Sequence, residues 1–474
     1  MLNFSILVDG ALVDSDEKIS VMNPTTNTVA GTLPLFEPKA LVDTALAAAN
    51  EAYIDWKVTS PKERIDLLLK VKELFLQHQE ELADILVLEI AKSKKDSLTE
   101  IVRTCEYIDA TIESYNEIMA NPLIIDENTH HIKGKTGIFS REPLGVVVAI
   151  APFNYPFNLL MAKLAPALVA GNTVVYKPAS QGSLIGARVS QLFHEAGFPK
   201  GVVNCVVGSG RSIGDLLVED GRVAMISFTG SDTVGLRIAE KAKGIPLVLE
   251  MGGKDPAIVM EDANLELAAN EIIKGGFSYN GQRCTAIKRV FVHKSVHDEL
   301  VKLLVEKVQK LSVGLPQDNA FITPLISNKA ADFVQGLVDD AIAEGAVCLT
   351  EMKRERNLMW PMLVDQVTVD MDLAWEEPFG PVIPVITYDD LTICVENVNA
   401  SKYGLQASVF TEDMVKAEEV ANLIEAGTVN INRSSSRGPD IFPFSGVKNS
   451  GLGVQGIKDA LISMTRVKGI VFNK

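Results

Sequence analysis

Hydrophobic and polar residues alternate in different ways in successive parts of this chain. Residues 5–35 alternate short apolar runs with turn-forming residues, which predicts a few leading strands. From Pro38 to about Ala120, apolar residues recur at helical spacing with charges between them, so this region predicts several amphipathic helices. Arg103 lies on one of these predicted helices.

Two series of short, nearly all-apolar runs follow, and helical patterns separate the runs. Such runs are typical of parallel strands that are buried on both faces of a sheet. The pattern resumes after Gly252-Gly253, so we expect two α/β domains. The runs are 145–150, 173–176, 201–207 and 225–228, and then 257–260, 286–292, 381–386 and 407–410.

A polar stretch broken by two glycines, residues 126–141, precedes the first series. Its last part can form a strand, and the β-prone segment 466–472 would need a partner strand to be ordered. We therefore expect an extruded hairpin that pairs with the C-terminal segment. Such arms often join subunits, and a solvent-exposed excursion fits the sequence nearly as well.

Composition and charge narrow the classes of protein and of partner. With 474 residues and 47% hydrophobic composition, the chain can bury a large core and is too long for one simple domain. A net charge of −16 disfavours nucleic acid and anionic membranes as partners, and an anionic substrate would need a local cluster of cations. No stretch predicts a signal peptide or a membrane span.

Cysteine usage points to the chemistry. The five cysteines, at positions 105, 205, 284, 348 and 394, are far apart and form no C-x-x-C pair, which argues against structural zinc and fits a reducing cytoplasm. Cys284 is flanked by Arg283, Lys288 and Arg289, and nearby cations favour the thiolate that attacks an electrophilic carbon. It is a candidate nucleophile, although an intracellular cysteine is more often a small buried hydrophobe.

Two polar residues are candidates for the other catalytic roles. Glu250 ends an apolar run and precedes two glycines, so partial desolvation is expected to raise its pKa and suit it to take a proton from water. It equally fits a capping residue or a partner of Lys254. Asn154 lies in the loop after a buried strand, where its side-chain amide would stabilise an oxyanion or hold a turn.

Three further motifs have competing interpretations. Residues 228–235 follow a strand and open a helix, which suits a phosphate or a plain tight turn. Residues 208–214 contain G-x-S-x-G, but a hydrolase also needs an acid and then a histidine downstream, and only His293 and His297 follow. These two histidines lack the glutamate of a metalloprotease motif, so we expect surface residues and no metal site.

Six motifs resemble, in order and spacing, those of the aldehyde dehydrogenase superfamily, and the resemblance spans nearly the whole chain. Within it, four features look most like the non-phosphorylating, NADP-dependent glyceraldehyde-3-phosphate dehydrogenases: Asn154-Tyr155, Arg103, Gln282-Arg283-Cys284-Thr285 and Ser436-Arg437-Gly438. The six motifs are Phe153-Asn154-Tyr155-Pro156, Lys177-Pro178, Phe228-Thr229-Gly230-Ser231, Glu250-Met251-Gly252-Gly253-Lys254, Gly281-Gln282-Arg283-Cys284 and Glu376-Glu377-Pro378-Phe379-Gly380-Pro381.

The resemblance implies an α/β fold with a variant Rossmann cofactor domain, an α/β catalytic domain and a small β oligomerisation arm, assembled as a homotetramer. The implied division has cofactor-domain parts at 1–125 and 143–250 and the oligomerisation hairpin at 126–142. The catalytic domain would span 251–440, and 441–474 would return to the cofactor domain and supply the C-terminal oligomerisation strand.

The implied reaction is the irreversible, NADP-dependent oxidation of D-glyceraldehyde 3-phosphate to 3-phosphoglycerate. Cys284 would add to the aldehyde, Asn154 and the Cys284 amide would hold the alkoxide, and Glu250 would activate the water that hydrolyses the thioester. The runner-up is oxidation of a carboxylated semialdehyde or a general aldehyde, because arginine grips carboxylate as well as phosphate. A binding protein without turnover is a third reading.

The resemblance also assigns binding residues. Lys177 and Glu377 would bind the cofactor riboses, and Phe379 would pack near the nicotinamide. Ser180 replaces the glutamate of many NAD-preferring members, so Lys177 and Ser180 are expected to receive the 2′-phosphate of NADP. The residues expected to border the pyrophosphate are Phe228, Thr229, Gly230 and Ser231.

The substrate's phosphate is expected to meet three arginines. Arg103, Arg283 and Arg437 match the phosphate-binding positions of the subfamily, with Tyr155 and Thr285 beside them. The alternatives are that Arg283 only activates Cys284, and that Arg103 and Arg437 form ordinary surface ion pairs.

Overall fold

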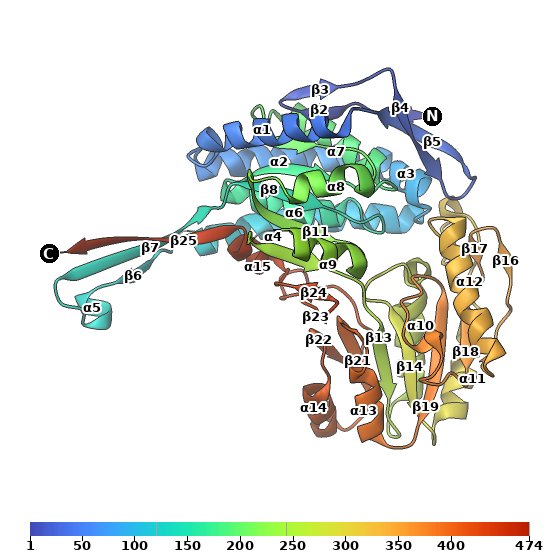
Figure 1. Cartoon of the computed structure of the whole chain (residues 1–474). Coiled ribbons are helices and arrows are strands. Elements are labelled where there is room, and N and C mark those ends of the chain that lie inside the picture. The colour runs from blue at the N-terminus through green and yellow to red at the C-terminus, as the bar shows by residue number, and fades with distance from the viewer. Residues whose placement is uncertain (120, 243, 474) are drawn as a thin grey trace.

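Two large, mostly parallel sheets organise the chain, as the two series of apolar runs predict. The computed structural model describes residues 1–119, 121–242 and 244–473; Ala120, at the expected end of the helical region, lies outside them. One sheet and its helices form the upper part of Figure 1, and the other sheet forms the lower part.

The first sheet has six strands, of which the last pairs antiparallel with its neighbour. Its central strands are entirely or almost entirely buried, which explains their uninterrupted apolar runs. In spatial order the strands are β10 (Val203–Cys205), β9 (Thr173–Lys177), β8 (Val146–Ile150), β11 (Val223–Thr229), β12 (Leu247–Glu250) and β24 (Gly451–Leu452).

Helices cover this sheet, and α6 is buried along its whole length because it packs against β8 and against three other helices, α2, α4 and α15. These helices are α1 (Pro38–Trp56), α2 (Pro61–Gln77), α3 (Gln79–Ile90), α4 (Lys94–Met119), α6 (Asn158–Ala170), α7 (Ser183–Ala196), α8 (Gly210–Val218), α9 (Asp232–Lys241) and α15 (Ile457–Ser463). The expected helical region is confirmed, with Arg103 on α4.

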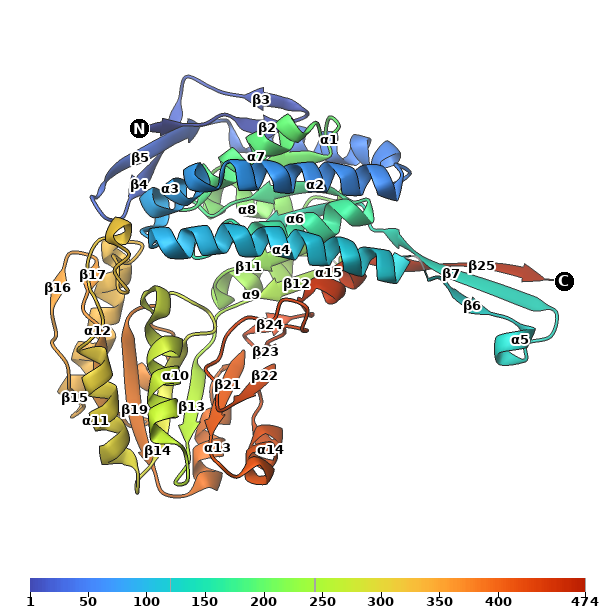
Figure 2. The same cartoon turned by 180° about the vertical axis from the view of Figure 1, so that it is seen from behind.

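The expected leading strands are confirmed too. They make a small sheet and a separate hairpin at the N-terminal edge, where Figures 1 and 2 show them above α7. The sheet contains β1 (Leu2–Asn3), β5 (Thr28–Pro34) and β4 (Lys18–Asn23), and the hairpin contains β2 (Ile6–Val8) and β3 (Ala11–Val13).

The second large sheet has seven strands and contains every run of the second apolar series. Three short strands of this sheet have no counterpart among the runs: β15, β18 and β22. In spatial order the strands are β15 (Val347–Cys348), β18 (Met362–Asp365), β19 (Val382–Tyr388), β14 (Ile287–His293), β13 (Asp255–Val259), β21 (Gln406–Phe410) and β22 (Thr428–Ile431).

Helices and small elements complete this half of the molecule. The helices are α10 (Leu265–Phe277), α11 (His297–Val308), α12 (Asn328–Ala343), α13 (Leu391–Asn399) and α14 (Met414–Leu423), with short 3-10 turns η1 (Ser278–Gly281), η2 (Pro316–Asp318) and η3 (Asp372–Ala374). The small strand pairs are β16 (Arg354–Glu355) with β17 (Leu358–Met359) and β20 (Tyr403–Gly404) with β23 (Val447–Lys448).

An arm projects from the body of the molecule (Figures 1 and 2). Strand β7 (Lys135–Pro143) pairs antiparallel with the C-terminal strand β25 (Thr465–Asn473) over nine residues, so the expected pairing of hairpin and C-terminal segment is confirmed. Strand β6 (Leu123–Ile125) lies on the other edge of β7, and the short helix α5 (Glu127–His130) follows it.

The chain crosses from one large sheet to the other between β12 and β13. Because β12 ends at Glu250 and β13 begins at Asp255, only residues 251–254 separate the two sheets at this point. Strand β24 later brings the chain back to the first sheet. Among the described helices, none is both long and apolar enough to cross a bilayer.

Candidate active site

A strained turn presents Cys284 between η1 and β14. Tyr279, Asn280 and Gly281 have φ angles of +49°, +59° and +69°, a region that non-glycine residues rarely occupy. A Cβ on Gly281 would lie 2.4 Å from the carbonyl oxygen of Gly380, so only glycine fits there. The Asn280 side chain is buried and fixed by hydrogen bonds, which hold the turn in this conformation.

Asn154 lies next to this turn. Its side-chain Nδ2 donates a hydrogen bond to the backbone oxygen of Gln282 over 2.9 Å, two residues before Cys284. The residue is buried in the loop that follows β8. The structure therefore brings the candidate oxyanion donor and the candidate nucleophile together from two different sheets.

A buried lysine that sequence reasoning missed supports this loop. Lys92 donates to the backbone oxygen of Asn154 over 2.7 Å, pairs with Glu100 and lies over the Tyr155 ring, 3.7 Å from its centroid. Glu100 in turn accepts two backbone N–H groups at the start of α6. This ion pair thus fixes both Asn154 and Tyr155, and the sequence offered no signal for it because its contacts are long-range.

Glu250 is the last residue of β12, and both of its carboxylate oxygens are engaged. Oε1 accepts from Arg437 Nη1 over 2.7 Å. Oε2 accepts from the Thr229 hydroxyl over 2.5 Å and lies 3.5 Å from Lys163 Nζ. Burial alone raises the pKa of Glu250, but Arg437, Lys163 and Thr229 together lower it below its ordinary value. The expectation that the pKa of Glu250 is raised is therefore wrong, because the same burial places Arg437 and Lys163 beside the carboxylate.

Lys163 is another residue that sequence reasoning missed. It is the one cation of α6, a helix whose other residues are apolar or uncharged and all buried. Burial lowers its pKa to about 8, while Glu250 raises it. A single lysine inside an otherwise apolar helix is a signal that could have been used, because a buried cation needs a nearby anion.

Of the three flanking cations expected to favour the Cys284 thiolate, Lys288 does lower the thiol pKa, but burial outweighs it. Burial raises the pKa of Cys284 to about 11, with Glu250 and Glu377 raising it and Lys288 and Arg437 lowering it. Arg289 turns away to the backbone oxygens of Lys254 and Val398. Sequence neighbours on a strand alternate in direction, so closeness along the chain does not place a charge beside the thiol.

Lys288 is the flanking cation that stays near the nucleophile. Its Nζ donates to the backbone oxygen of Cys284 over 2.5 Å and lies 2.9 Å from a carboxylate oxygen of Glu377. Arg283 instead donates to the backbone oxygen of Gly275. Its Nε is buried and has no hydrogen-bond partner among the described residues.

Arg103 and Arg437 meet at one carboxylate, Asp440. Arg103 binds it through Nε and Nη2, over 2.8 and 2.7 Å, and also donates to the backbone oxygen of Arg437 over 3.0 Å. The Nε atom of Arg437 is 4.0 Å from Asp440. Both arginines therefore form ion pairs, as the alternative of ordinary surface ion pairs predicts. Arg437, however, is mostly buried and not a surface residue. Sequence reasoning missed Asp440, because its hydrogen-bond partner Arg103 is 337 residues away and leaves no local pattern.

Two other candidate substrate residues border the same region. The Tyr155 ring lies edge-on to Tyr279, with the ring centroids 5.9 Å apart. Thr285 is buried, and its backbone oxygen accepts from the Ser435 hydroxyl over 2.9 Å. This contact ties the segment that contains Arg437 to the nucleophile loop.

Lys177 and Ser180 lie at the end of β9 and just after it. Lys177 is buried, its Nζ donates to the backbone oxygen of Pro178 over 2.9 Å, and burial lowers its pKa to about 8. No carboxylate pairs with it in the part of the chain that the structure describes. Ser180 is exposed. An uncompensated buried cation next to an exposed hydroxyl fits a phosphate group.

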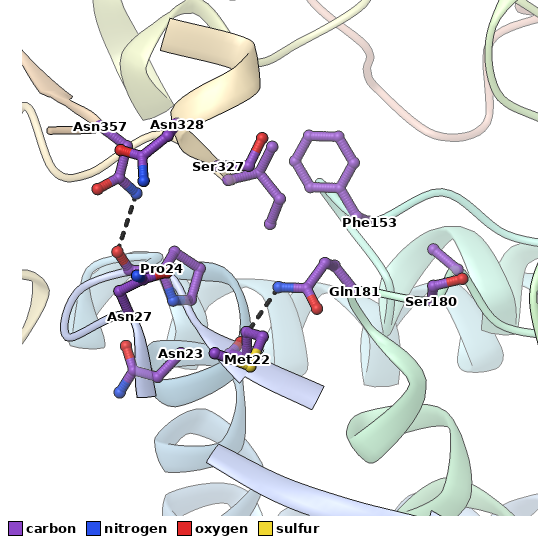
Figure 3. Close-up of a pocket in the computed structure, with 12 residues that line it drawn as sticks. Met22, Asn23, Pro24, Asn27, Phe153, Ser180, Gln181, Ser327, Asn328 and Asn357 are labelled. Atoms are coloured by element: carbon purple, nitrogen blue, oxygen red, sulfur yellow. Dashed lines mark hydrogen bonds between the residues drawn. The ribbon is translucent and has the colours of Figure 1, made fainter. Parts of the chain in front are cut away.

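A pocket of about 460 Å³ opens beside Ser180 (Figure 3). Phe153, Ser180 and Gln181 line it on the side of the first sheet, and Ser327 and Asn328 line it on the side of the second. The end of the candidate cofactor site is therefore open to solvent.

The turn between β11 and α9 packs tightly against the ring of Phe228. A Cβ on Gly230 would lie 2.5 Å from the Phe228 ring, so this turn requires a glycine. Ser231 is the N-cap of α9 but makes no side-chain cap bond, and a pyrophosphate fits this helix N-terminus. Thr229 does not face that helix end, because its hydroxyl donates to Glu250.

Glu377 and Phe379 come from the second sheet and face the first. Glu377 accepts from the backbone N–H of Gly253 over 3.1 Å besides pairing with Lys288. The ring of Phe379 packs edge-on against Phe153, with the centroids 5.8 Å apart. The candidate cofactor residues thus come from both halves of the molecule, and the buried cation Lys177 and the uncapped N-terminus of α9 suit the phosphates of a dinucleotide.

The competing motifs have ordinary structural partners. Ser212, the serine of G-x-S-x-G, shares hydrogen bonds with Ser209 at the start of α8. His297 bonds to Asp365 over 2.9 Å, and His293 to Ser295 over 2.7 Å. Within the described residues, no group of three or more histidine, cysteine or acidic side chains is arranged to hold a metal ion.

Comparisons with known proteins agree with this geometry. The model of the aldehyde dehydrogenase family matches residues 12–470, and the chain belongs to that family. It is 46% identical to the NADP-dependent glyceraldehyde-3-phosphate dehydrogenase of Pisum sativum, covering 97% of this chain and 92% of that one. The enzyme of the same name from Streptococcus equinus is also 46% identical, with 98% of each chain covered.

A solved structure is similar over the whole chain. The NADP-dependent glyceraldehyde-3-phosphate dehydrogenase from Bacillus halodurans C-125, complexed with NADP, is 48% identical, with a TM-score of 0.97 and all of both chains covered. The expected aldehyde dehydrogenase fold is thereby confirmed.

Proposed function

We propose that this protein oxidises D-glyceraldehyde 3-phosphate irreversibly to 3-phosphoglycerate with NADP. The observation that carries the substrate is the pair of arginines near the candidate base, in which Arg437 bonds to Glu250 and Arg103 bonds to the Arg437 backbone oxygen and to Asp440. A chain of net charge −16 needs such a cluster to hold a phosphorylated aldehyde.

The first half of the reaction uses Cys284. Its thiolate adds to the aldehyde carbon, forming the C–S bond, and the carbonyl electron pair moves to oxygen. Asn154 Nδ2 and the Cys284 backbone N–H stabilise this alkoxide. Lys288 and Arg437 favour the thiolate, since both lower the thiol pKa. Collapse of the alkoxide to a thioester expels a hydride, and NADP held by the residues named below would supply the acceptor.

The second half uses Glu250. A water molecule adds to the thioester carbon while one of its protons passes to the Glu250 carboxylate. The C–S bond then breaks, the Cys284 thiolate is restored, and a free acid rather than an acyl phosphate is released.

For the cofactor, we propose that Lys177 and Ser180 hold the 2′-phosphate and that Gly230 and Ser231, on the turn that packs on Phe228, border the pyrophosphate, whereas Thr229 faces Glu250 instead. Glu377 would bind a ribose hydroxyl and Phe379 would lie beside the nicotinamide. The uncompensated charge of Lys177 supports the phosphate assignment. For the substrate, Tyr155 and Thr285 would line the same space as the arginines.

We further propose a cytoplasmic homotetramer, with residues 1–125, 143–250 and 441–474 forming the cofactor part and residues 251–440 the catalytic part. The five free cysteines support a reducing compartment. The arm supports assembly, because its outer strand exposes Val467, Ile470, Val471 and Phe472.

A substrate panel tests the proposed activity. With NADP and without inorganic phosphate, kcat/KM is expected to be highest for glyceraldehyde 3-phosphate, lower for succinate semialdehyde and glyceraldehyde, and the product should be 3-phosphoglycerate. Arg103→Gln should lower kcat/KM for the phosphorylated aldehyde about ten- to a hundredfold, because it removes a charge-assisted contact worth roughly 1.5 to 3 kcal/mol. A preference for succinate semialdehyde would overturn the proposal.

A further inference from the structure

Arg437 joins two groups that the proposed reaction uses at different moments. On one side its Nη1 bonds to Glu250 Oε1 over 2.7 Å. On the other side its Nε is 4.0 Å from Asp440, the carboxylate that Arg103 grips with two hydrogen bonds. One guanidinium group therefore links the candidate base to the candidate anion site.

Glu250 is a weakened base while these contacts last. Its Oε1 accepts a hydrogen bond from Arg437 and its Oε2 accepts one from Thr229, with Lys163 nearby, so both oxygens are already stabilised in the charged form. The same contacts lower its pKa, whereas a general base works best with a pKa near the working pH. Loss of the Arg437 contact would make Glu250 a stronger base for hydrolysis of the thioester.

We infer that the anionic group of the substrate draws Arg437 away from Glu250, so that the base for thioester hydrolysis is released only when an anionic aldehyde is bound. This inference rests on the proposed function. A phosphate dianion attracts a guanidinium group more strongly than one carboxylate does, and it offers three acceptor oxygens.

The charges around Arg437 support this exchange. Three cations, Lys163, Arg103 and Arg437, face two carboxylates, Glu250 and Asp440, so the cluster carries one excess positive charge. Asp440 holds Arg103 in place through two hydrogen bonds while Arg437 has only the 4.0 Å contact to it. Arg437 is therefore the less firmly bound arginine once its bond to Glu250 is exchanged, since its other contact is with the Phe444 ring, 4.9 Å from the centroid.

The consequence is that the enzyme discriminates phosphorylated from uncharged aldehydes at thioester hydrolysis as well as at substrate binding. An uncharged aldehyde still acylates Cys284 and releases one NADPH, but its thioester is hydrolysed slowly because Arg437 stays on Glu250. Selectivity then shows in the deacylation rate and not only in KM.

Stopped-flow kinetics separates these steps, since the NADPH burst reports acylation and the later steady phase reports deacylation. With wild-type enzyme, the glyceroyl thioester made from glyceraldehyde should deacylate more slowly than the thioester made from glyceraldehyde 3-phosphate. Arg437→Gln should speed deacylation of the glyceroyl thioester, because it removes a cation that lowers the pKa of Glu250. The same variant should lose efficiency with glyceraldehyde 3-phosphate.

Added phosphite supplies a second measurement on the intact protein. It should speed glyceraldehyde deacylation in the wild type, where it can engage Arg437, and leave Arg437→Gln unaffected. Arg433→Gln is the matched control, because Arg433 is an exposed arginine of the same segment that contacts Glu271 instead of Glu250. It should deacylate both thioesters at wild-type rates.

The outcomes are distinguishable. If Arg437→Gln deacylates the glyceroyl thioester no faster than wild type and phosphite has no effect, the exchange does not occur, whatever the preferred substrate. If the wild type prefers an unphosphorylated aldehyde, the proposed function itself fails.

Discussion

At the scale of single residues, the charge state of Cys284 depends on side chains from four separate parts of the chain. Burial is the largest influence and raises the thiol pKa to about 11; Lys288 and Arg437 oppose it, whereas Glu250 and Glu377 add to it. The thiolate is thus a minor species in the free enzyme. At any pH below the thiol pKa, the thiolate fraction rises steeply as the pH rises.

This gives a test by alkylation in the absence of cofactor and substrate. The rate of iodoacetamide labelling at Cys284 should rise about tenfold per pH unit between about pH 7 and pH 9 without levelling off. Peptide mass spectrometry assigns the site, because Cys348 is also partly exposed. Glu250→Gln should label faster at a given pH, since it removes an anion, and Lys288→Met should label slower. A plateau below pH 8 would contradict the high thiol pKa.

Ser180 provides the second residue-scale test. Ser180→Glu would place a carboxylate beside the uncompensated Lys177, where it repels a 2′-phosphate and can accept from a ribose hydroxyl. The ratio of kcat/KM with NADP to kcat/KM with NAD should fall by about tenfold or more, a change of roughly 1.4 kcal/mol. Ser180→Gln is the uncharged control and should change the ratio less. An unchanged ratio for the glutamate variant would remove Ser180 from the cofactor site.

At the scale of helices and strands, the sequence predicts the elements whose burial gives a regular pattern of apolar residues. Strands β8, β9, β13 and β14 are buried on both faces, so their residues form continuous apolar runs that stand out. Strand β24 has two residues and β15 has two, too few to show any period. Their pairing depends on neighbouring strands that the local sequence does not encode.

The arm gives a test at this scale. Val467 and Val471 lie four residues apart on β25 and point to the same face, and both are exposed. Val467→Asp combined with Val471→Asp should give smaller assemblies in analytical ultracentrifugation, because two charges would be buried at a subunit contact. Val58→Asp, at an exposed valine after α1, is the control. An unchanged mass for the double variant would make the arm a solvent-exposed excursion.

At the scale of the whole molecule, the site exists only because the two sheets meet. Asn154, Glu250 and Lys177 come from the first sheet, whereas Cys284 and Glu377 come from the second. Sequence reasoning singled out Cys284, Glu250 and Asn154 from their local surroundings, and the resemblance to a known family added Lys177 and Glu377. It did not find Lys92, Lys163 or Asp440, because the contacts that place them in the site join residues 62, 87 and 337 positions apart.

The same comparison explains both pKa corrections. Sequence reasoning estimated the effect of burial from local hydrophobicity and the effect of charge from neighbours along the chain. In the folded molecule Glu250 is surrounded by cations from α6 and from residue 437, and Cys284 by carboxylates from β12 and residue 377. Charges brought together by tertiary structure reverse the expectation for Glu250, whereas for Cys284 burial is the largest cause and the two carboxylates add to it.

The most direct test of the account is a rapid-mixing measurement on Glu250→Gln with NADP and glyceraldehyde 3-phosphate. Glutamine keeps the size of the side chain but cannot take a proton, so the variant should form about one NADPH per site in a burst and then almost stop. Cys284→Ala should show neither burst nor turnover. A Glu250→Gln enzyme that lacks the burst, or that turns over at the wild-type rate, would contradict hydrolysis of a Cys284 thioester by water that Glu250 activates.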